Sequence, residues 1–405
     1  MRYIHRQIEP LLRKWVRQFP ALAVTGPRQC GKSTLLKEVF SPTYRYMTFD
    51  DPVVREQATS DPRLFLEKAG DNVILDEIQY VPQLLSYVKM AIDADRGRRG
   101  RFLFTGSQQF AMMKDLGDSL VGRIALLELL PFHLEEKQSV PQLKKSLSKP
   151  TEAFVHGCLS GSFPEMTLPP APDRRAWYGA YLNTYLEGDI RTLYNVGELR
   201  EFQRFTQLLA TRVSQMLNLS ALSRELGVSV NTLKRWTSIL EASRMIYLLP
   251  PYYQNFGKRM TKSPKVYFLD CALVCYLTGV ETREHLLNGP LAGALFENFC
   301  LQETLKTFFF RGARPRVYYV RSYSGLEVDL LIEGKDLQLF PCEVKLTKTP
   351  RPQMGEPIRR FRELFPKLPI GEGRILCLAE EDFFLDRTSR VQTFGSYWEW
   401  LRQET

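Results

Sequence analysis

The chain has 405 residues, too many for a single hydrophobic core, so roughly two to four domains are expected. Its hydrophobic fraction of 44% and charged fraction of 25% are those of an ordinary globular protein, and they exclude a disordered chain or one made mostly of membrane helices. The net charge of +10 favours a polyanionic partner, with nucleic acid as the first candidate.

The beginning of the chain predicts where the protein resides. The N-terminal MRYIHRQIEPLLRKW lacks the apolar core of a secretory signal, so we expect a cytoplasmic protein that does not associate with membranes. The seven cysteines form no Cys-x-x-Cys pair, which is typical of reduced thiols and not of a disulfide framework or a zinc site.

The first informative segment is TGPRQCGKSTLL at residues 25–36. It follows the apolar run ALAVT and leads into TLLKEVF, so the predicted order is strand, glycine-rich loop and helix. In such a P-loop the backbone N–H groups face phosphates, Lys32 holds the β- and γ-phosphates, and the Ser33 hydroxyl binds Mg²⁺. The predicted nucleotide-binding residues are Gly26, Pro27, Arg28, Gln29, Cys30, Gly31, Lys32, Ser33 and Thr34.

Two later strands are expected to end at the same edge of a parallel sheet as this loop. NVILDEIQ predicts a strand that ends in Asp76 and Glu77, where Asp76 would help to hold Mg²⁺ and Glu77 would polarise the attacking water. RFLFTGSQQF places Thr105 and Ser107 at the exit of another strand, where a hydroxyl could bond to the γ-phosphate. Together these residues predict an Mg²⁺-dependent ATP hydrolase.

A candidate arginine finger follows. Gly122-Arg123 precedes the apolar run IALLELLPF. An arginine donated to a neighbouring subunit's nucleotide contributes ~10³–10⁵ in rate, and we expect this role for Arg123. The alternative is a surface arginine without a catalytic part.

GPRQCGKSTLL, LDEIQ, TGSQQF, SLVGR and LPFHLEE occur in this order over the first third of the chain, and together they resemble the AAA+ family. The resemblance is to a bacterial and archaeal branch whose ATPase is followed by an uncharacterised C-terminal region, and SGSFPE at 160–165 is similar to the start of that branch's next segment. It implies ATP-dependent conformational work and assembly into a homo-oligomer, with a hexameric ring expected. We therefore expect an α/β domain with a parallel sheet at 1–135 and a helical connector at 136–198.

Residues 199–263 predict a helix-turn-helix. Ser220 is expected to cap a first helix, Gly227 to end it and Ser229 to cap a second helix, NTLKRWTSILEASRMI. An apolar strand and the basic turn NFGKRMTKSPK follow, which indicates a winged version. The expected DNA-binding residues are Asn231, Thr232, Lys234 and Arg235 on the second helix and Lys258, Arg259 and Lys262 on the wing. The alternative is a module that docks proteins or oligomerises.

Residues 264–405 contain carboxylates within apolar segments. Glu297 lies in the predicted helix GALFENFCLQETL, Asp329 in one strand of a predicted hairpin, and Glu343 and Lys345 two positions apart in LQLFPCEVKLTK. Residues two apart on a strand share a face, so these side chains are expected to converge. Asp329 and Glu343 would then bind Mg²⁺ while Lys345 positions or activates water, as phosphodiester hydrolysis requires.

Glu297, Asp329, Glu343 and Lys345 follow the order of the PD-(D/E)XK nuclease superfamily, which this last third of the chain resembles. The resemblance implies an α/β restriction-endonuclease-like domain. Two alternatives stay open: a structural cluster of salt bridges, or a nuclease fold that has lost activity and only binds.

The sequence as a whole predicts an ATP-driven motor that binds duplex or branched DNA and processes it, with helicase activity or branch migration of Holliday junctions as plausible tasks in repair or recombination. One alternative is an ATP-controlled regulatory switch whose C-terminal domain is a catalytically silent platform. A defence effector that cuts cellular DNA is another.

Overall fold

The computed structural model describes residues 3–41, 43–106, 120, 122–185, 199–252, 263–322 and 325–404. It divides into two compact units. The first comprises Met1–Phe132, Ala242–Arg244 and Phe309–Gly312, and the second comprises His133–Glu241, Met245–Phe308 and Ala313–Thr405. The predicted site residues Ser107, Lys258, Arg259 and Lys262 lie outside the described residues.

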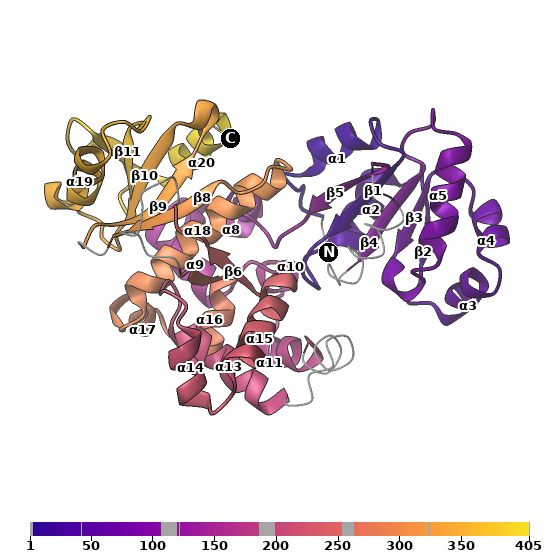
Figure 1. The fold of residues 1–405 in the computed structure, drawn as a ribbon, viewed down its shortest axis with the longest axis horizontal. Coiled ribbons are helices and arrows are strands. Elements are labelled where there is room, and N and C mark those ends of the chain that lie inside the picture. Colours follow the sequence, from indigo (N-terminus) through magenta and orange to yellow (C-terminus); the bar gives the residue numbers. More distant parts are fainter. Residues whose placement is uncertain are drawn as a thin grey trace. The chain divides into compact units, whose positions relative to one another are not determined.

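The first unit contains a five-stranded parallel sheet with the strand order β2-β3-β4-β1-β5 (Figure 1). The strands are β1 Ala21–Thr25, β2 Arg45–Thr48, β3 Val73–Asp76, β4 Phe102–Gly106 and β5 Ile124–Glu128. The α/β fold and the parallel sheet expected for this part of the chain are confirmed. Because all five strands run the same way, their carboxyl ends lie along one edge, which is where ligands bind to such sheets.

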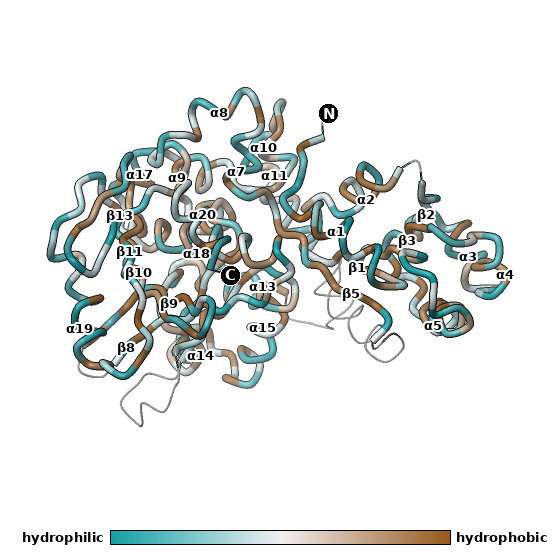
Figure 2. The backbone as a smooth tube through the Cα atoms, turned by 90° about the horizontal axis from the view of Figure 1, so that it is seen from above, coloured by the Kyte–Doolittle hydropathy of each residue, from teal (hydrophilic) through white to brown (hydrophobic). Residues whose placement is uncertain are grey.

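The helix α1 Glu9–Val16 precedes the first strand. The strands are connected through α2 Lys32–Phe40, α3 Pro52–Ser60, α4 Pro62–Ala69, the short 3₁₀ helix η1 Ile78–Tyr80 and α5 Leu84–Ala94. Every residue of β1, β3 and β4 is buried, as the continuous apolar runs predict for strands covered on both faces. In Figure 2 the hydrophobic colour follows most of β5, although this strand lies at the edge of the sheet and its Leu126 is exposed.

The second unit begins with helices. They are α7 Leu134–Gln138, α8 Pro141–Leu147, α9 Pro150–Leu159, α10 Pro164–Thr167, α11 Arg174–Thr184, α13 Leu199–Thr211, α14 Leu219–Leu226 and α15 Val230–Ala242, whose last residue belongs to the first unit. The aromatic residues Trp177 and Tyr178 of α11 are buried, so they act as core residues.

The predicted helix pair is present in α14 and α15, with one correction at its start. The N-cap of α14 is Asn218, whose side chain accepts a hydrogen bond from the backbone N–H of Ala221 at 3.0 Å. Ser220, which the sequence analysis assigned to this place, lies inside the helix instead. Gly227 ends α14 in the left-handed conformation, with φ 71°, and Ser229 Oγ accepts from the N–H of Thr232 at 3.1 Å, both as expected.

Two short antiparallel strands, β6 Ile246–Leu249 and β7 Lys265–Phe268, follow α15 and pair across the predicted domain boundary at 263/264. Three helices come next, α16 Cys271–Thr278, α17 Arg283–Asn288 and the long α18 Ala292–Phe310, whose last two residues belong to the first unit. The division of the second unit into a connector, a helix-turn-helix domain and a nuclease-like domain remains a prediction.

The C-terminal part is built on a mixed sheet of order β12-β13-β11-β10-β9-β8. Its strands are β8 Val317–Arg321, β9 Glu327–Glu333, β10 Leu339–Val344, β11 Gly373–Leu376, β12 Phe383–Phe384 and β13 Ser389–Gln392. The helical segments are η4 Lys335–Leu337, η5 Pro352–Gly355, α19 Glu356–Leu364 and α20 Phe394–Glu404. β8 and β9 form the predicted antiparallel hairpin, and most of α19 is hydrophilic (Figure 2).

Within the described ranges, every helix is too short or too polar to traverse a lipid bilayer.

Candidate functional site

The loop between β1 and α2 has a backbone that only certain residues can adopt. Gly26 has φ 140°, and a Cβ at this position would lie 2.0 Å from the carbonyl oxygen of Leu129, so a side chain cannot fit. Gln29 and Gly31 also have positive φ angles, 59° and 95°. These turns fold the loop back over the end of β1 and place the N-terminus of α2 at the carboxyl edge of the sheet.

The two polar residues that open α2 both contact other parts of this edge. Lys32 is buried, and its Nζ donates to the carbonyl oxygens of Gly26 at 3.1 Å and of Pro27 at 2.7 Å. Ser33 Oγ donates to Asp76 Oδ1 at 2.9 Å. The structure therefore brings the predicted loop residues and the acidic end of β3 together.

Asp76 is 3% exposed and accepts hydrogen bonds from three hydroxyl groups, those of Ser33, Tyr46 and Thr105. Burial and the hydrogen bond to Asp76 raise the pKa of Tyr46, so this phenol stays a donor at neutral pH. Tyr46 was not among the residues predicted from the sequence. Its place at the centre of β2, beside the acidic strand, is a signal that only the sheet order reveals.

Glu77 follows Asp76 in a left-handed conformation with φ 56°, and its N–H donates to Thr105 Oγ1 at 3.3 Å. Its carboxylate accepts from the side-chain amide of Gln79. Partial burial, and then the charges of Glu77 and Asp76, raise the pKa of Asp50, which follows β2. The negative charges of Asp76 and Glu77 at this edge therefore extend to the end of β2.

The other predicted loop residues differ in their surroundings. Cys30 is fully buried, and burial raises the pKa of its thiol, so this residue fills space and is not a reactive nucleophile. Arg28 is half-buried, whereas Thr34 on α2 is exposed.

Arg123 lies at the opposite edge of the sheet. It directly precedes β5, whose first residue pairs with Ala21 at the beginning of β1, and the phosphate loop leaves the far end of β1. Its guanidinium makes two hydrogen bonds to Asp93 of α5, at 2.8 and 2.9 Å, and these lower the pKa of Asp93. Arg123 therefore lies at the end of the sheet away from the loop between β1 and α2, and its role as a finger in a neighbouring subunit's site remains a prediction.

In the second unit, Asp329, Glu343 and Lys345 come together. Cys342 of β10 pairs with Leu330 of β9, which sets Glu343 beside Asp329. Lys345 Nζ lies 3.1 Å from Asp329 Oδ2 and 2.8 Å from Glu343 Oε2. The predicted convergence of these side chains is therefore present in the structure.

The electrostatics of this cluster are unusual. Glu343 is 2% exposed, and burial followed by the charge of Asp329 raises its pKa to about 8. Burial disfavours the charge of Lys345, but Asp329 and Glu343 outweigh it and raise the pKa of this ammonium. Oε1 of Glu343 is buried without a hydrogen-bond partner among the described residues, which is costly unless another ligand contacts it.

Glu297 of α18 has different partners. Lys265 Nζ lies 3.2 Å from its Oε1, the Tyr267 hydroxyl donates to the same oxygen, and Lys265 also lies 2.9 Å from Glu327. Burial, and also the negative charge of Asp329, raises the pKa of Glu297. Among the described residues, however, the two carboxylates have no hydrogen-bond partner in common. Lys265 and Tyr267 were not predicted from the sequence, although a lysine two positions before a tyrosine in the strand KVYF places both side chains on one face and was a usable signal.

The cluster of Asp329, Glu343 and Lys345 has some of the ligands that a metal ion requires. Asp329 and Glu343 offer the hard oxygen ligands that Mg²⁺ prefers, and a site with two carboxylates can be completed by water. Among the described residues, however, no group of three or more histidine, cysteine or acidic side chains is arranged to hold an ion.

The polar face of α15 is open to solvent. Asn231, Lys234 and Arg235 are exposed, and Thr232 is half-buried beside Ser229, with its Oγ1 2.8 Å from Ser229 Oγ. Positions three and four apart lie on one side of a helix, so these residues form one surface.

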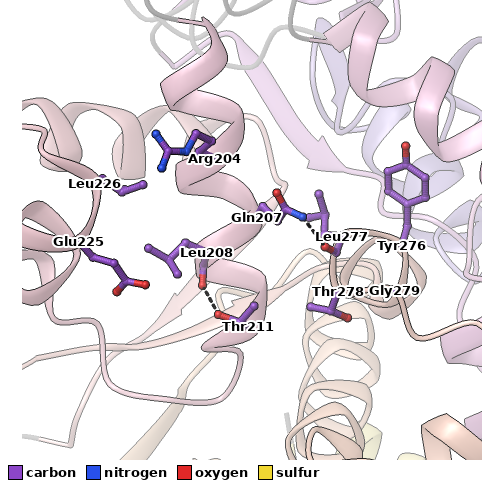
Figure 3. A pocket seen from close by; sticks show the side chains of 10 residues that line it. All are labelled: Arg204, Gln207, Leu208, Thr211, Glu225, Leu226, Tyr276, Leu277, Thr278 and Gly279. Atoms are coloured by element: carbon purple, nitrogen blue, oxygen red, sulfur yellow. Dashed lines mark hydrogen bonds between the residues drawn. The ribbon is translucent and has the colours of Figure 1, made fainter.

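A cavity of about 590 Å³ lies between α13, α14 and the end of α16 (Figure 3). At its wall, the side chain of Gln207 on α13 donates to the carbonyl oxygen of Leu277 on α16 at 3.2 Å. Its lining contains none of the site residues predicted from the sequence.

Three family models match the chain, each over a separate segment. Residues 18–138 match an AAA domain. Residues 151–284 match a domain of unknown function, DUF8612, and residues 292–397 match another, DUF4143. An AAA+ ATPase domain at the front of the chain is thereby supported, and the C-terminal region is of a family without an assigned activity.

Solved structures with some likeness include a Walker-type ATPase of Pyrococcus abyssi, PABY2304, at 15% identity and a TM-score of 0.46, covering 68% of this chain and 96% of that one. Another is the RuvB Holliday junction branch migration motor of Thermotoga maritima, at 15% identity and a TM-score of 0.30, covering 61% and 90%.

Protein relatives cover more of the chain. The uncharacterized protein MJ1544 of Methanocaldococcus jannaschii is 21% identical, covering 93% of this chain and 87% of its own length. The uncharacterized proteins Rv2008c of Mycobacterium tuberculosis and Mb2031c of Mycobacterium bovis are each 30% identical over 340 residues, which cover 84% of this chain and 73% of theirs. With this extent of identity and an AAA domain at its front, the chain belongs to the family of Rv2008c and Mb2031c.

Proposed function

We propose that the first unit binds ATP with Mg²⁺ and hydrolyses it, and that this turnover drives the processing of DNA. The observation that carries the first part is the 2.9 Å hydrogen bond from Ser33 at the start of α2 to Asp76 at the end of β3. It places the phosphate loop and the acidic strand end at one site, which is the arrangement that nucleotide hydrolysis in P-loop proteins requires.

Each residue at this edge has a part in the proposed reaction. Lys32, held at the mouth of the loop by two carbonyl oxygens, would transfer its hydrogen bonds to the β- and γ-phosphates. Ser33 and Asp76 offer hard oxygens to Mg²⁺, which would neutralise charge on the phosphates when bound. Glu77 would accept a hydrogen bond from the attacking water and orient it for in-line attack.

The DNA part of the proposal is supported by the exposed polar face of α15 and by the net charge of +10. Asn231 and Thr232 would reach base edges, and Lys234 and Arg235 would contact phosphates, as in other helix-turn-helix proteins. We propose that the predicted wing residues also contact the DNA. We further propose that the chains assemble into a ring, in which Arg123 would leave Asp93 and contact the γ-phosphate bound by a neighbouring subunit.

For the C-terminal cluster we propose Mg²⁺-dependent cleavage of phosphodiester bonds. The unpartnered Oε1 of Glu343 supports a cation between Asp329 and Glu343, and Lys345 would then hold the attacking water. A second candidate is a binding platform without catalysis. The pairing of Glu297 with Lys265 favours it, because that lysine already neutralises one of the expected carboxylates.

The experiment for the first site compares purified wild type with Lys32→Ala and Glu77→Gln. We expect Lys32→Ala to lose nucleotide binding, because the group that holds the phosphates is gone. Glu77→Gln should bind ATP normally and lose activity by about 10²–10⁴-fold, the usual contribution of a general base. ATP binding by Lys32→Ala at wild-type affinity, or full turnover by Glu77→Gln, would contradict the assignment.

The experiment for the second site offers single-stranded, duplex and four-way-junction DNA with Mg²⁺. Asp329→Ala and Lys345→Ala should each abolish cleavage while ATP hydrolysis continues. If wild type cleaves none of these DNA forms, the platform replaces the nuclease in this proposal.

A further inference from the structure

The short segment before α1 contacts the underside of the phosphate loop through one buried side chain. Arg6 is 4% exposed. Its Nη1 donates to the carbonyl oxygen of Cys30 at 2.9 Å, and its Nη2 donates to the carbonyl oxygen of Leu130 at 2.6 Å. One guanidinium therefore joins the last turn of the loop to the segment that follows β5.

The guanidinium is fixed from several sides. Its carbon lies 4.8 Å from the ring centre of Phe132 and 5.6 Å from that of Phe310, in the geometry of cation–π contacts. The backbone N–H of Arg6 donates to Glu9 Oε1 at 2.7 Å, which also holds the segment itself in place. With two aromatic rings close to the guanidinium carbon and two carbonyls bonded to its nitrogens, the side chain has little freedom.

Peptide geometry gives the contact to Cys30 a consequence for the ligand. In a planar trans peptide the C=O and the following N–H point in opposite directions. Holding the Cys30 carbonyl towards Arg6 therefore directs the N–H of Gly31 away from it. Gly31 is the N-cap of α2, so its N–H belongs to the group of helix-terminal donors that receive phosphate.

We propose that Arg6 is a positioning residue of the nucleotide site: it fixes the orientation of the Cys30–Gly31 peptide and so presets the Gly31 N–H for a phosphate oxygen of the nucleotide. The buried positive charge behind the loop adds to the attraction for phosphate. This inference rests on the proposed ATP binding and names a residue outside the P-loop motif as part of that site.

The test measures dissociation constants of ATP and ADP by calorimetry for wild type and Arg6→Ala. Arg13→Ala is the matched control, because Arg13 lies in the same part of the chain and also donates to a backbone carbonyl, that of Val39 near the far end of α2, at 3.2 Å. Arg6→Ala should raise the dissociation constants of both nucleotides by about tenfold, the effect of losing one charge-assisted hydrogen bond. Arg13→Ala should leave both dissociation constants unchanged.

Chemical rescue separates positioning from general damage to the fold. In Arg6→Ala, guanidinium ion at low millimolar concentration should restore much of the affinity, because it can occupy the place of the lost side-chain group and bond both carbonyls. Methylammonium should not, because it lacks the planar fork. Arg6→Lys provides a folded alternative and should have an intermediate affinity, since it keeps the charge and loses the double contact.

The outcomes are distinguishable. Wild type without measurable ATP affinity contradicts the proposed function itself. Wild-type binding together with equal dissociation constants for Arg6→Ala, Arg6→Lys and Arg13→Ala overturns the role of Arg6 alone. Loss of affinity in Arg6→Ala that guanidinium does not restore, with Arg6→Lys equal to wild type, also overturns it, because charge and not orientation is then what matters.

Discussion

At the scale of single residues, buried carboxylates fall into two classes. Lys306 lies 2.6 Å from Glu303, and together with His133 it outweighs desolvation and lowers the pKa of Glu303 to about 2. Glu343 is equally enclosed, yet burial and Asp329 raise its pKa to about 8. The first carboxylate is fully compensated, as structural ion pairs are. The second is not, and incomplete compensation of this kind is typical of sites that bind a ligand.

A histidine on α9 should affect stability at acid pH. The side chain of His156 is half-buried, but its Nδ1 is enclosed without a hydrogen-bond partner among the described residues. This desolvation, and then the charge of Lys137, lowers the pKa of His156 to about 3. Between pH 3 and about 6.5 the unfolded chain binds a proton there that the folded chain does not, so stability falls as the pH is lowered through this window. The slope from this residue is about 1.4 kcal/mol per pH unit at most.

We therefore expect His156→Gln to flatten the dependence of the unfolding free energy on pH between 5 and 6.5, measured by urea denaturation. His5→Gln is the control, since the side chain of His5 is 87% exposed. Equal slopes for wild type and His156→Gln would contradict an imidazole that stays neutral in the folded chain through this pH range.

At the scale of elements, the start of α14 depends on Asn218 and not on the exposed Ser220. Asn218→Ala removes the acceptor for the Ala221 N–H and should destabilise the protein by about 1 kcal/mol, the usual effect of losing an N-cap. Ser220→Ala should be neutral within about 0.5 kcal/mol. Thermal or urea unfolding measures both, and the reverse ranking would restore Ser220 as the cap.

The polar face of α15 gives a second prediction at this scale. Replacing Lys234 and Arg235 by glutamine should weaken DNA binding and reduce the slope of log affinity against log salt by about two counterion equivalents. The same double change at Lys144 and Lys145, exposed on α8, alters net charge equally and should leave the slope unchanged. Equal slopes for the two double variants would remove α15 from the DNA-binding surface.

How far the sequence could predict this structure depended on how local each signal was. β1 and the loop after it were predictable because an apolar run, glycines and a lysine occur together in the chain. Tyr46 beside Asp76 was not predictable, because only the sheet order places β2 next to β3. The same holds for the partner of Arg123, since Asp93 lies on a helix that precedes β4 and nothing near Arg123 in the sequence indicates it.

At the scale of the whole molecule, the chain combines a parallel-sheet nucleotide unit with a second unit that carries the helix pair and the carboxylate–lysine cluster. The structure gives the phosphate loop, Asp76 and Glu77 one common edge. The three family models cover separate segments. The first is an AAA domain, and the other two are domains of unknown function. The proposed function therefore requires that nucleotide turnover in the first unit responds to what the second unit binds.

The most direct measurement is the steady-state rate of ATP hydrolysis with Mg²⁺, recorded without nucleic acid and with single-stranded, duplex and four-way-junction DNA, for wild type and for Glu77→Gln. We predict that wild type hydrolyses ATP and that at least one DNA form raises its rate of hydrolysis. Glu77→Gln should show neither the basal hydrolysis nor the increase with DNA. A wild-type rate that is the same with every DNA form and without any would contradict the coupling of ATP turnover to DNA.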